Sequence, residues 1–283
     1  MPQITLGKAV GCKGVSLHSG REVGMEFRPA PENAGIVFHI HAEDGVHLLS
    51  PRPEAVSTTE LATTISDGQA HVSTIEHVLA ALSGLAVDNV EVHVAGGEVP
   101  ILDGSARQVV EALRSAGFTT QNAPRRVARV MRECRLEKDG RSIVARPFEG
   151  FHVDYTIRFP HPAIGEQRFA LDVTPESFAS EIAPARTFGF LKEVEYLHSR
   201  GLARGGSLDN VVVVGDEGVL NREGLRFPDE FVRHKLLDFI GDMAMLGCPL
   251  LGSFTVACSG HGHNNAFLRM LAGEEGLLEY GNR

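Results

Sequence analysis

The chain has 283 residues and a mass of 30.5 kDa, long enough to bury one large core or two smaller ones. Its formal net charge of -9 argues against a nucleic-acid-binding surface, which would be basic, and no apolar run is long enough to span a membrane. The four cysteines form no CxxC pair and the N-terminus lacks the features of a signal peptide, so we expect a reduced, cytoplasmic protein.

The first half of the sequence predicts strands followed by helices. Residues 2–60 alternate apolar and polar residues between turns, as β-strands do. The elements expected next are a helix over 73–84, a strand over 88–95 and a helix over about 105–116. Gly84 and Gly117 are placed to end the two helices.

Two histidines on one of the early strands are candidate metal ligands. His39 and His41 lie two residues apart and therefore point to the same side of the strand. Two imidazoles in this arrangement could share a metal ion. Because no third ligand is nearby in the sequence, we interpret them as part of a solvated strand face.

The polar stretch 121–126 contains a proline and is the expected boundary between two domains. The elements predicted beyond it are strands within 127–173, a short helix at 175–181, a helix at 191–199, a strand at 211–214, a helix at 231–242, a strand at 250–257 and a helix at about 264–272. We therefore expect an α+β fold with domains at residues 1–123 and 127–272, followed by a loosely held tail at 273–283.

The helix expected over 231–242 carries the most distinctive polar pattern. His234, Asp238 and Asp242 recur at one-turn intervals and share a face, with Lys235 at its edge and apolar residues opposite. A His and an Asp one turn apart can bind a single metal ion. The same spacing occurs in ordinary solvated His–Asp pairs, so a metal site requires a third ligand and a base from elsewhere.

Three other segments could supply those groups. His77 offers an imidazole, and the adjacent Glu76 offers a carboxylate suited to a base. However, Ser73 and Glu76 also match a capping box, and His77 alone would be interpreted as a surface or core histidine. His261 could lie at the edge of a site or simply begin a helix. The loop 185–190 offers a hydroxyl and aromatic side chains, or forms a packed turn.

Together these segments resemble the UDP-3-O-acyl-N-acetylglucosamine deacetylases, which are zinc enzymes of lipid A synthesis. The resemblance runs in the family's order through the blocks 14–20, 73–77, 88–90, 98–105, 185–190, 205–207, 231–238 with Gly241 and Asp242, and 259–261. These blocks are specific and spread over about residues 14–270. The chain is identified as a member of that family.

The resemblance implies two similar domains, each a β-sheet layered on helices, with the helices packed between the two sheets. The active site would lie at the junction of the domains. One Zn²⁺ per chain would be held by His77, His234 and Asp238, with water in the fourth position. Fe²⁺ is not excluded, because it accepts the same set of two histidines and one aspartate.

The resemblance also implies four catalytic residues. Glu76 would take the proton of the attacking water, and the Thr187 hydroxyl would help to hold the tetrahedral oxyanion. His261, as an imidazolium, would stabilise charge or donate a proton to the leaving amine, and Asp242 would orient it. Whether Glu76 serves alone as base and then acid, or shares the work with His261, stays open.

Further residues are implied for the substrate. Lys235 would bind near the sugar and diphosphate, and Phe188 would pack on the sugar ring. An inserted β-α-β element at about 191–213 would enclose the acyl chain. The residues expected to contact the substrate there are Leu191, Val194, Leu197, Ala203, Ser207 and Val213. Ordinary core packing is the alternative interpretation of the apolar ones.

The expected function is zinc-dependent removal of acetate from UDP-3-O-(3-hydroxyacyl)-N-acetylglucosamine, the committed step of lipid A biosynthesis. The substrate is the expected partner, without nucleic acid or a membrane span, and a monomer is expected. One alternative is a zinc hydrolase of the same fold acting on another N-acyl substrate. The other is a non-catalytic protein in which zinc joins two domains, which would require four protein ligands where three are visible.

Overall fold

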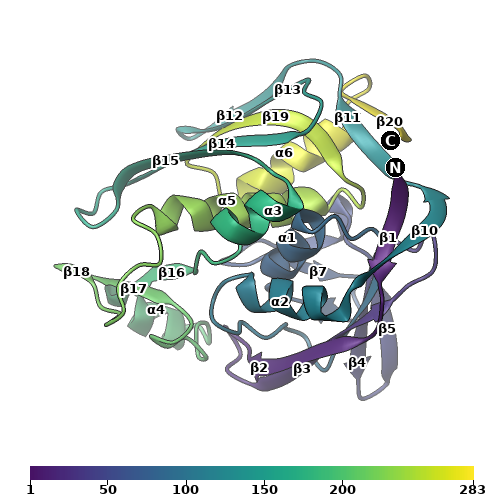
Figure 1. Ribbon diagram of the computed structural model, residues 1–283. Coiled ribbons are helices and arrows are strands. Elements are labelled where there is room, and N and C mark those ends of the chain that lie inside the picture. The colour runs from purple at the N-terminus through teal and green to yellow at the C-terminus, as the bar shows by residue number, and fades with distance from the viewer.

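The computed structural model describes all 283 residues and has an α+β architecture, with helices lying between two main sheets (Figure 1). A continuous hydrophobic core of 54 buried residues runs through both halves of the chain. None of the helices is both long and apolar enough to cross a bilayer. The predicted fold class is confirmed.

The main sheet of the first half lies at the bottom of Figure 1. In spatial order its strands are β2 (Val10–Val15), β3 (Glu22–Pro29), β9 (Val90–Val94), β4 (Ile36–Ala42) and β5 (Gly45–Leu49). Alternate residues such as Phe38 and Ile40 are buried, while their neighbours on the strand face outward. The period-2 pattern therefore fixes which face of the sheet covers the helices.

Shorter elements complete the first half. β1 (Pro2–Leu6) pairs with β10 (Phe118–Pro124), and a small sheet contains β6 (Val56–Thr58), β7 (Thr64–Ser66) and β8 (His71–Val72). The helices are α1 (Glu76–Gly84) and α2 (Arg107–Ala116). Gly117 ends α2 with a φ of 70°, as predicted. Gly84 is the last residue of α1, as predicted, and packing also requires glycine there because a side chain would overlap the Phe178 ring.

The second half forms the seven-stranded sheet at the top of Figure 1. Its strands are β11 (Arg126–Val130), β12 (Cys134–Lys138), β13 (Arg141–Arg146), β14 (Phe151–Phe159), β15 (Gly165–Asp172), β19 (Leu250–Ala257) and β20 (Leu278–Asn282). Its helices are α3 (Pro175–Ser177), α5 (Glu230–Ala244) and α6 (His261–Gly273). β19 is central, since it pairs with β13, β14 and β11.

The tail expected to be loose is instead part of this sheet. β20 pairs antiparallel with the whole length of β11, and Leu277 before it is fully buried. The prediction was wrong because the pairing joins segments about 150 residues apart, which local composition does not reveal.

An inserted β-α-β element interrupts the second half, as expected. β16 (Phe188–Phe190) and β17 (Val212–Gly215) are parallel and are connected through α4 (Val194–Ser199), and β18 (Gly218–Val219) extends this separate three-stranded sheet. No residue of α4 is fully buried. α4 therefore stands to one side of the main core (Figure 1), whereas Val212 and Val214 of β17 belong to that core.

The helix over 230–244 is buried on nearly all sides. Its apolar residues join the core as predicted, but His234, Asp238 and Asp242 are also at most 4% exposed. The solvated-face interpretation is thus wrong. Carboxylates are rarely buried unless they are paired or bind a metal, so this polar face has partners inside the molecule.

A close crossing of α1 and α5 brings the two halves together at this face. A methyl group on Gly241 of α5 would lie 2.0 Å from the carbonyl oxygen of Glu76 on α1. Only glycine permits such an approach of two helix backbones. The crossing places the start of α1 directly against the polar face of α5.

We expect Gly241→Ala to destabilise the protein by about 1–3 kcal/mol, because the added methyl forces the two helices apart. Urea denaturation measures the loss. Gly273→Ala, at the end of α6, is the matched control, since a methyl there meets no atom within 4 Å. Equal stability of the two variants would contradict the close crossing.

Candidate active site

Three potential metal ligands meet where α1 and α5 cross. His77 and His234 present their Nε2 atoms to Asp238 Oδ1 at 3.5 Å and 3.3 Å, and their rings lie edge to face with centroids 4.9 Å apart. All three side chains are buried, and their donor atoms lie within 4.8 Å of one another. The structure therefore brings together His77, His234 and Asp238, the three residues expected to be metal ligands.

The donor atoms of this cluster are suited to a cation. His234 Nδ1 lies 3.0 Å from the Ala185 carbonyl oxygen, to which it donates, so its Nε2 keeps a free lone pair. Asp238 Oδ1 is buried without a hydrogen-bond partner. An orphaned carboxylate oxygen between two imidazole nitrogens is unfavourable unless an ion is bound there. Two histidines and one aspartate fit zinc.

Charge in the cluster favours an ionised carboxylate and a neutral imidazole. Burial alone would raise the pKa of Asp238, but the Lys235 ammonium, 2.7 Å from Oδ2, and the neighbouring histidines together outweigh it and hold that pKa well below its ordinary value. Burial lowers the pKa of His234 to about 3. Both groups are thus in the protonation state that a metal requires.

Glu76 begins α1 beside this cluster and does not form the capping box. Ser73 accepts a hydrogen bond from the Thr64 hydroxyl instead, and α1 has no side-chain cap. Glu76 Oε2 accepts from the Thr63 backbone N–H at 3.0 Å. Burial raises the pKa of Glu76, which brings this carboxylate closer to the range in which a base accepts a proton at neutral pH.

His261 begins α6 and faces Glu76 from the other side. Its Nδ1 lies 2.9 Å from Asp242 Oδ2, and its Nε2 lies 3.9 Å from Glu76 Oε1. Burial opposes the charged form, yet Asp242, helped by Glu76 and Asp238, raises the pKa of His261 to about 10. The imidazole is therefore an imidazolium at neutral pH.

This shift predicts a pH-dependent stability for the metal-free chain. The folded state keeps the His261 proton up to a pKa of about 10, while the unfolded chain releases it near 6.5. The stabilisation is therefore fully present below pH 6.5 and is lost as pH rises through 10, with a slope approaching about 1.4 kcal/mol per pH unit between them. Urea denaturation across that range measures it, and Asp242→Asn should remove most of the slope.

Two residues of the site were missed from the sequence. The Thr63 hydroxyl donates to Asp242 Oδ1 at 2.6 Å, and the Asn264 amide donates to Asp242 Oδ2 at 2.8 Å. Asn264 lies one turn after His261 on α6, and that spacing was the available signal. Thr63 lies in a loop and gives no periodic signal. Together they hold the Asp242 carboxylate against His261.

Of the other expected substrate residues, Phe188 and Lys235 lie beside the cluster, with the Phe188 ring 6.4 Å from that of His234 and Lys235 paired with Asp238. The Phe188 ring packs against Phe231 at 5.0 Å, and Lys235 Nζ lies 5.8 Å from its centroid. The Thr187 backbone donates to Gly104 and accepts from Val212. On the inserted element, Leu191 and Ser207 are exposed, and Val194, Leu197, Ala203 and Val213 are half-buried. Ordinary core packing does not describe these six residues.

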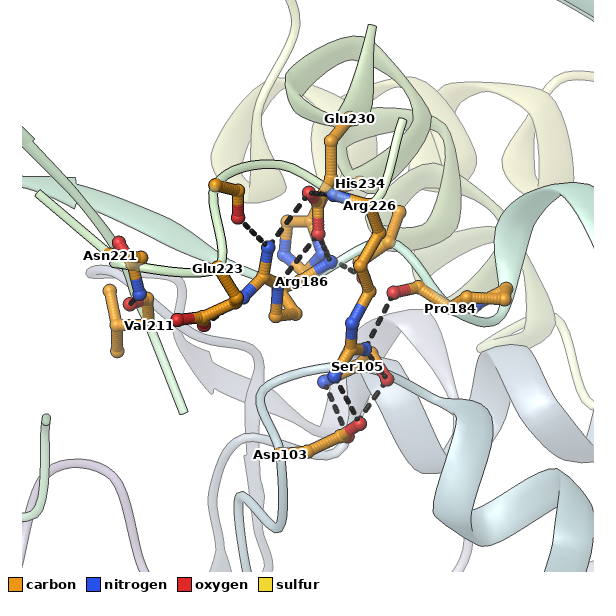
Figure 2. Close-up of polar contacts among 12 residues, drawn as sticks. Asp103, Ser105, Pro184, Arg186, Val211, Asn221, Glu223, Arg226, Glu230 and His234 are labelled. Carbon is orange, nitrogen blue, oxygen red and sulfur yellow. Dashed lines mark hydrogen bonds and ion pairs between the residues drawn. The ribbon is translucent and has the colours of Figure 1, made fainter. Parts of the chain in front are cut away.

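A buried ion-pair network lies next to His234 of the cluster (Figure 2). Arg186 and Glu230, at 2% and 1% side-chain exposure, pair at 2.8 Å, and Glu230 also accepts from the backbone N–H groups of Arg186 and Arg226. Arg226 reaches Asp103 of the first half at 2.9 Å. The network fixes the loop whose Ala185 carbonyl orients His234.

Comparison with known proteins assigns the chain to a family. The family model described as "LpxC: UDP-3-O-acyl N-acetylglycosamine deacetylase" matches residues 3–273. A UDP-3-O-acyl-N-acetylglucosamine deacetylase of Oleidesulfovibrio alaskensis is 56% identical over 277 residues, covering 98% of this chain and 91% of that relative. Proteins of the same name from Nitratidesulfovibrio vulgaris and Lawsonia intracellularis are 58% identical (96% and 88% covered) and 48% identical (98% and 91% covered). The chain belongs to the UDP-3-O-acyl-N-acetylglucosamine deacetylase family.

Proposed function

We propose that this protein removes acetate from UDP-3-O-(3-hydroxyacyl)-N-acetylglucosamine with the help of one zinc ion. The observation that carries the proposal is the buried cluster of His77, His234 and Asp238 beside a carboxylate with a raised pKa. The names of the relatives support the substrate, and with it a place in lipid A synthesis. Zinc held by this cluster would polarise the acetamide carbonyl and make a nearby water more acidic.

The residues around the cluster have separate roles in proton transfer and charge stabilisation. Glu76 takes a proton from the attacking water, since its carboxylate borders the cluster and its pKa is raised by burial. His261 holds a positive charge next to Glu76 and stabilises the negative charge that develops on the carbonyl oxygen. The leaving amine requires a proton, which either Glu76 or His261 can deliver. The Thr187 hydroxyl contributes a further donor toward the oxyanion.

The binding of the substrate follows from the surroundings of the cluster. Lys235 and Phe188 lie together at one edge, where an ammonium and an aromatic face suit a sugar that carries a diphosphate. The apolar residues expected to contact the acyl chain, Leu191, Val194, Leu197, Ala203 and Val213, lack full burial, so they are free to cover it. Burying that chain supplies binding energy at about 0.8 kcal/mol per CH₂ group.

A zinc site that only joins the two halves is disfavoured. Structural zinc sites use four protein ligands, and the cluster has three. Neither of the two neighbouring carboxylates belongs to the cluster: Asp242 is committed to Thr63, His261 and Asn264, and Glu76 accepts from the Thr63 backbone. A fourth position therefore stays available for water or substrate.

The test combines metal content with acetate release. The purified protein should hold one zinc at this cluster and release one acetate per UDP-3-O-acyl-glucosamine formed, and chelation should abolish turnover until zinc is restored. A panel of acyl-chain lengths should include UDP-N-acetylglucosamine without an acyl chain. A metal-loaded protein that releases no acetate from any member would overturn the proposal. If UDP-N-acetylglucosamine is turned over as fast as the acylated substrates, the natural substrate is a different N-acyl compound.

A further inference from the structure

His39 and His41, which the sequence suggested were part of a solvated strand face, are joined in the folded protein by two further potential ligands. His39 and His41 lie on the outer face of β4, and His93 on β9 stands directly beside His39 in the sheet. Glu91 lies two residues before His93 and therefore points to the same side. The missing third ligand is thus supplied by a strand about 50 residues away.

The side chains of this outer cluster are in mutual contact. The rings of His39 and His93 lie with centroids 4.3 Å apart, and those of His41 and His93 lie 5.3 Å apart. His93 Nδ1 is 3.0 Å from His41 Nε2, and its Nε2 is 3.1 Å from Glu91 Oε2. Although it lies on an outer face, the His93 side chain is only 10% exposed. These neighbours enclose it.

The donor set matches the preferences of divalent transition metals. His39, Glu91 and His93 each offer one atom, and these atoms lie within 4.8 Å of one another. Zinc holds such ligands at about 2.0–2.2 Å, so a modest rotation of the side chains completes the set. Imidazoles with a carboxylate suit zinc, nickel and copper better than magnesium or calcium, which prefer oxygen ligands.

We propose that His39, Glu91 and His93 form a second metal site, which binds a divalent transition-metal ion with His41 or water in the fourth position. In the metal-free chain His93 Nε2 lies 3.1 Å from Glu91 Oε2. A bound ion would take the place of this contact, with a coordination bond to each of the two side chains. Because the ligands lie on the adjacent strands β4 and β9, the ion also cross-links this pair of strands.

The charges around the cluster favour a cation. Glu26 of β3 stands opposite His93, and Arg28 stands opposite Glu91. Arg28 opposes a bound cation, but its guanidinium is paired with Glu26 at 2.6 Å. Two carboxylates face one guanidinium, so the local charge is negative when the imidazoles are neutral. A divalent ion is therefore attracted to the site.

The outer site is separate from the proposed catalytic centre. The residues that alternate with these ligands, such as Phe38, Ile40 and Val92, are fully or almost fully buried beneath the sheet. The sheet thus stands between the outer cluster and α1. Loss of the outer site should leave deacetylation unchanged.

Zinc binding to four forms of the full chain tests the proposal. Each metal-free protein is dialysed against Zn²⁺ and the bound zinc per chain is measured. We expect two ions for the parent, one for His93→Gln and one for His234→Gln, which lacks a ligand of the inner cluster. His47→Gln is the matched control and should bind two, because His47 belongs to the same sheet but pairs with Asp44 instead.

The outcomes separate this proposal from the proposed function. If the parent and His93→Gln bind the same number of ions, the outer site does not exist. The parent could instead bind a single ion that His93→Gln loses and His234→Gln keeps. That result would support the outer site and refute the zinc-dependent mechanism. His39→Gln provides a second variant, and it should weaken zinc binding at least tenfold without changing turnover.

Discussion

Replacing Glu76 by Gln should lower turnover by about 10²–10⁴-fold while the zinc remains bound. The amide keeps the size of the side chain but cannot accept the proton of the attacking water. Glu76 is not a member of the cluster of three ligands, so metal affinity should change little. Acetate release at saturating substrate, measured together with zinc content, checks both expectations.

Ser73→Ala is the matched control for Glu76→Gln. If Glu76 served only to cap α1, loss of either residue would affect stability and neither would affect turnover. The contacts predict the opposite, since Ser73 bonds Thr64 rather than the helix end. Ser73→Ala should turn over at close to the parent rate. Parent-like turnover by Glu76→Gln would refute its role as the base.

Replacing Glu230 by Gln should destabilise the protein by about 3–5 kcal/mol, the cost of leaving a buried charge without its partner. Glu230 and Arg186 are almost completely inaccessible to solvent, and the second partner of Arg186, Glu223, is largely exposed. The same change should also lower turnover, because the Arg186 segment carries the Ala185 carbonyl that orients His234. Urea denaturation measures the stability.

Two further variants sharpen this test. Glu166→Gln removes a comparably short ion pair, with Arg158, that is exposed on both sides and should leave stability nearly unchanged. The double variant Arg186→Met with Glu230→Leu should be less destabilised than Glu230→Gln alone, because no unpaired charge remains. A loss for Glu230→Gln as small as that of Glu166→Gln would exclude the buried pair as a support of the site.

Local patterns predicted most elements but not how they pair. The helix at 230–244 and the strand at 250–257 follow from periodicity, because each is set by neighbouring residues. The position of β20 beside β11 depends on residues far apart in the chain, and the sequence alone suggested a loose tail. The inserted element was expected only through the family resemblance.

For the candidate site too, local sequence patterns predicted some features and only the tertiary structure revealed the others. The spacing of His234 and Asp238 is visible in the sequence, whereas His77 becomes a partner only through the crossing of α1 over Gly241. The contacts of Thr63 and Thr64 exclude the capping box for Glu76, which the sequence left open. Sequence motifs therefore identified candidate residues, and tertiary contacts showed which of them lie together.

The position of α4 outside the core has a consequence for how the family can diversify. The three strands of the inserted element pair with no other strand, and α4 contributes no fully buried residue, although Val212 and Val214 of β17 join the core. Substitutions at exposed positions usually change stability by no more than about 0.5 kcal/mol. Under the proposed function, new acyl-chain preferences can therefore arise at such exposed positions by single substitutions that leave folding and the proposed metal cluster intact.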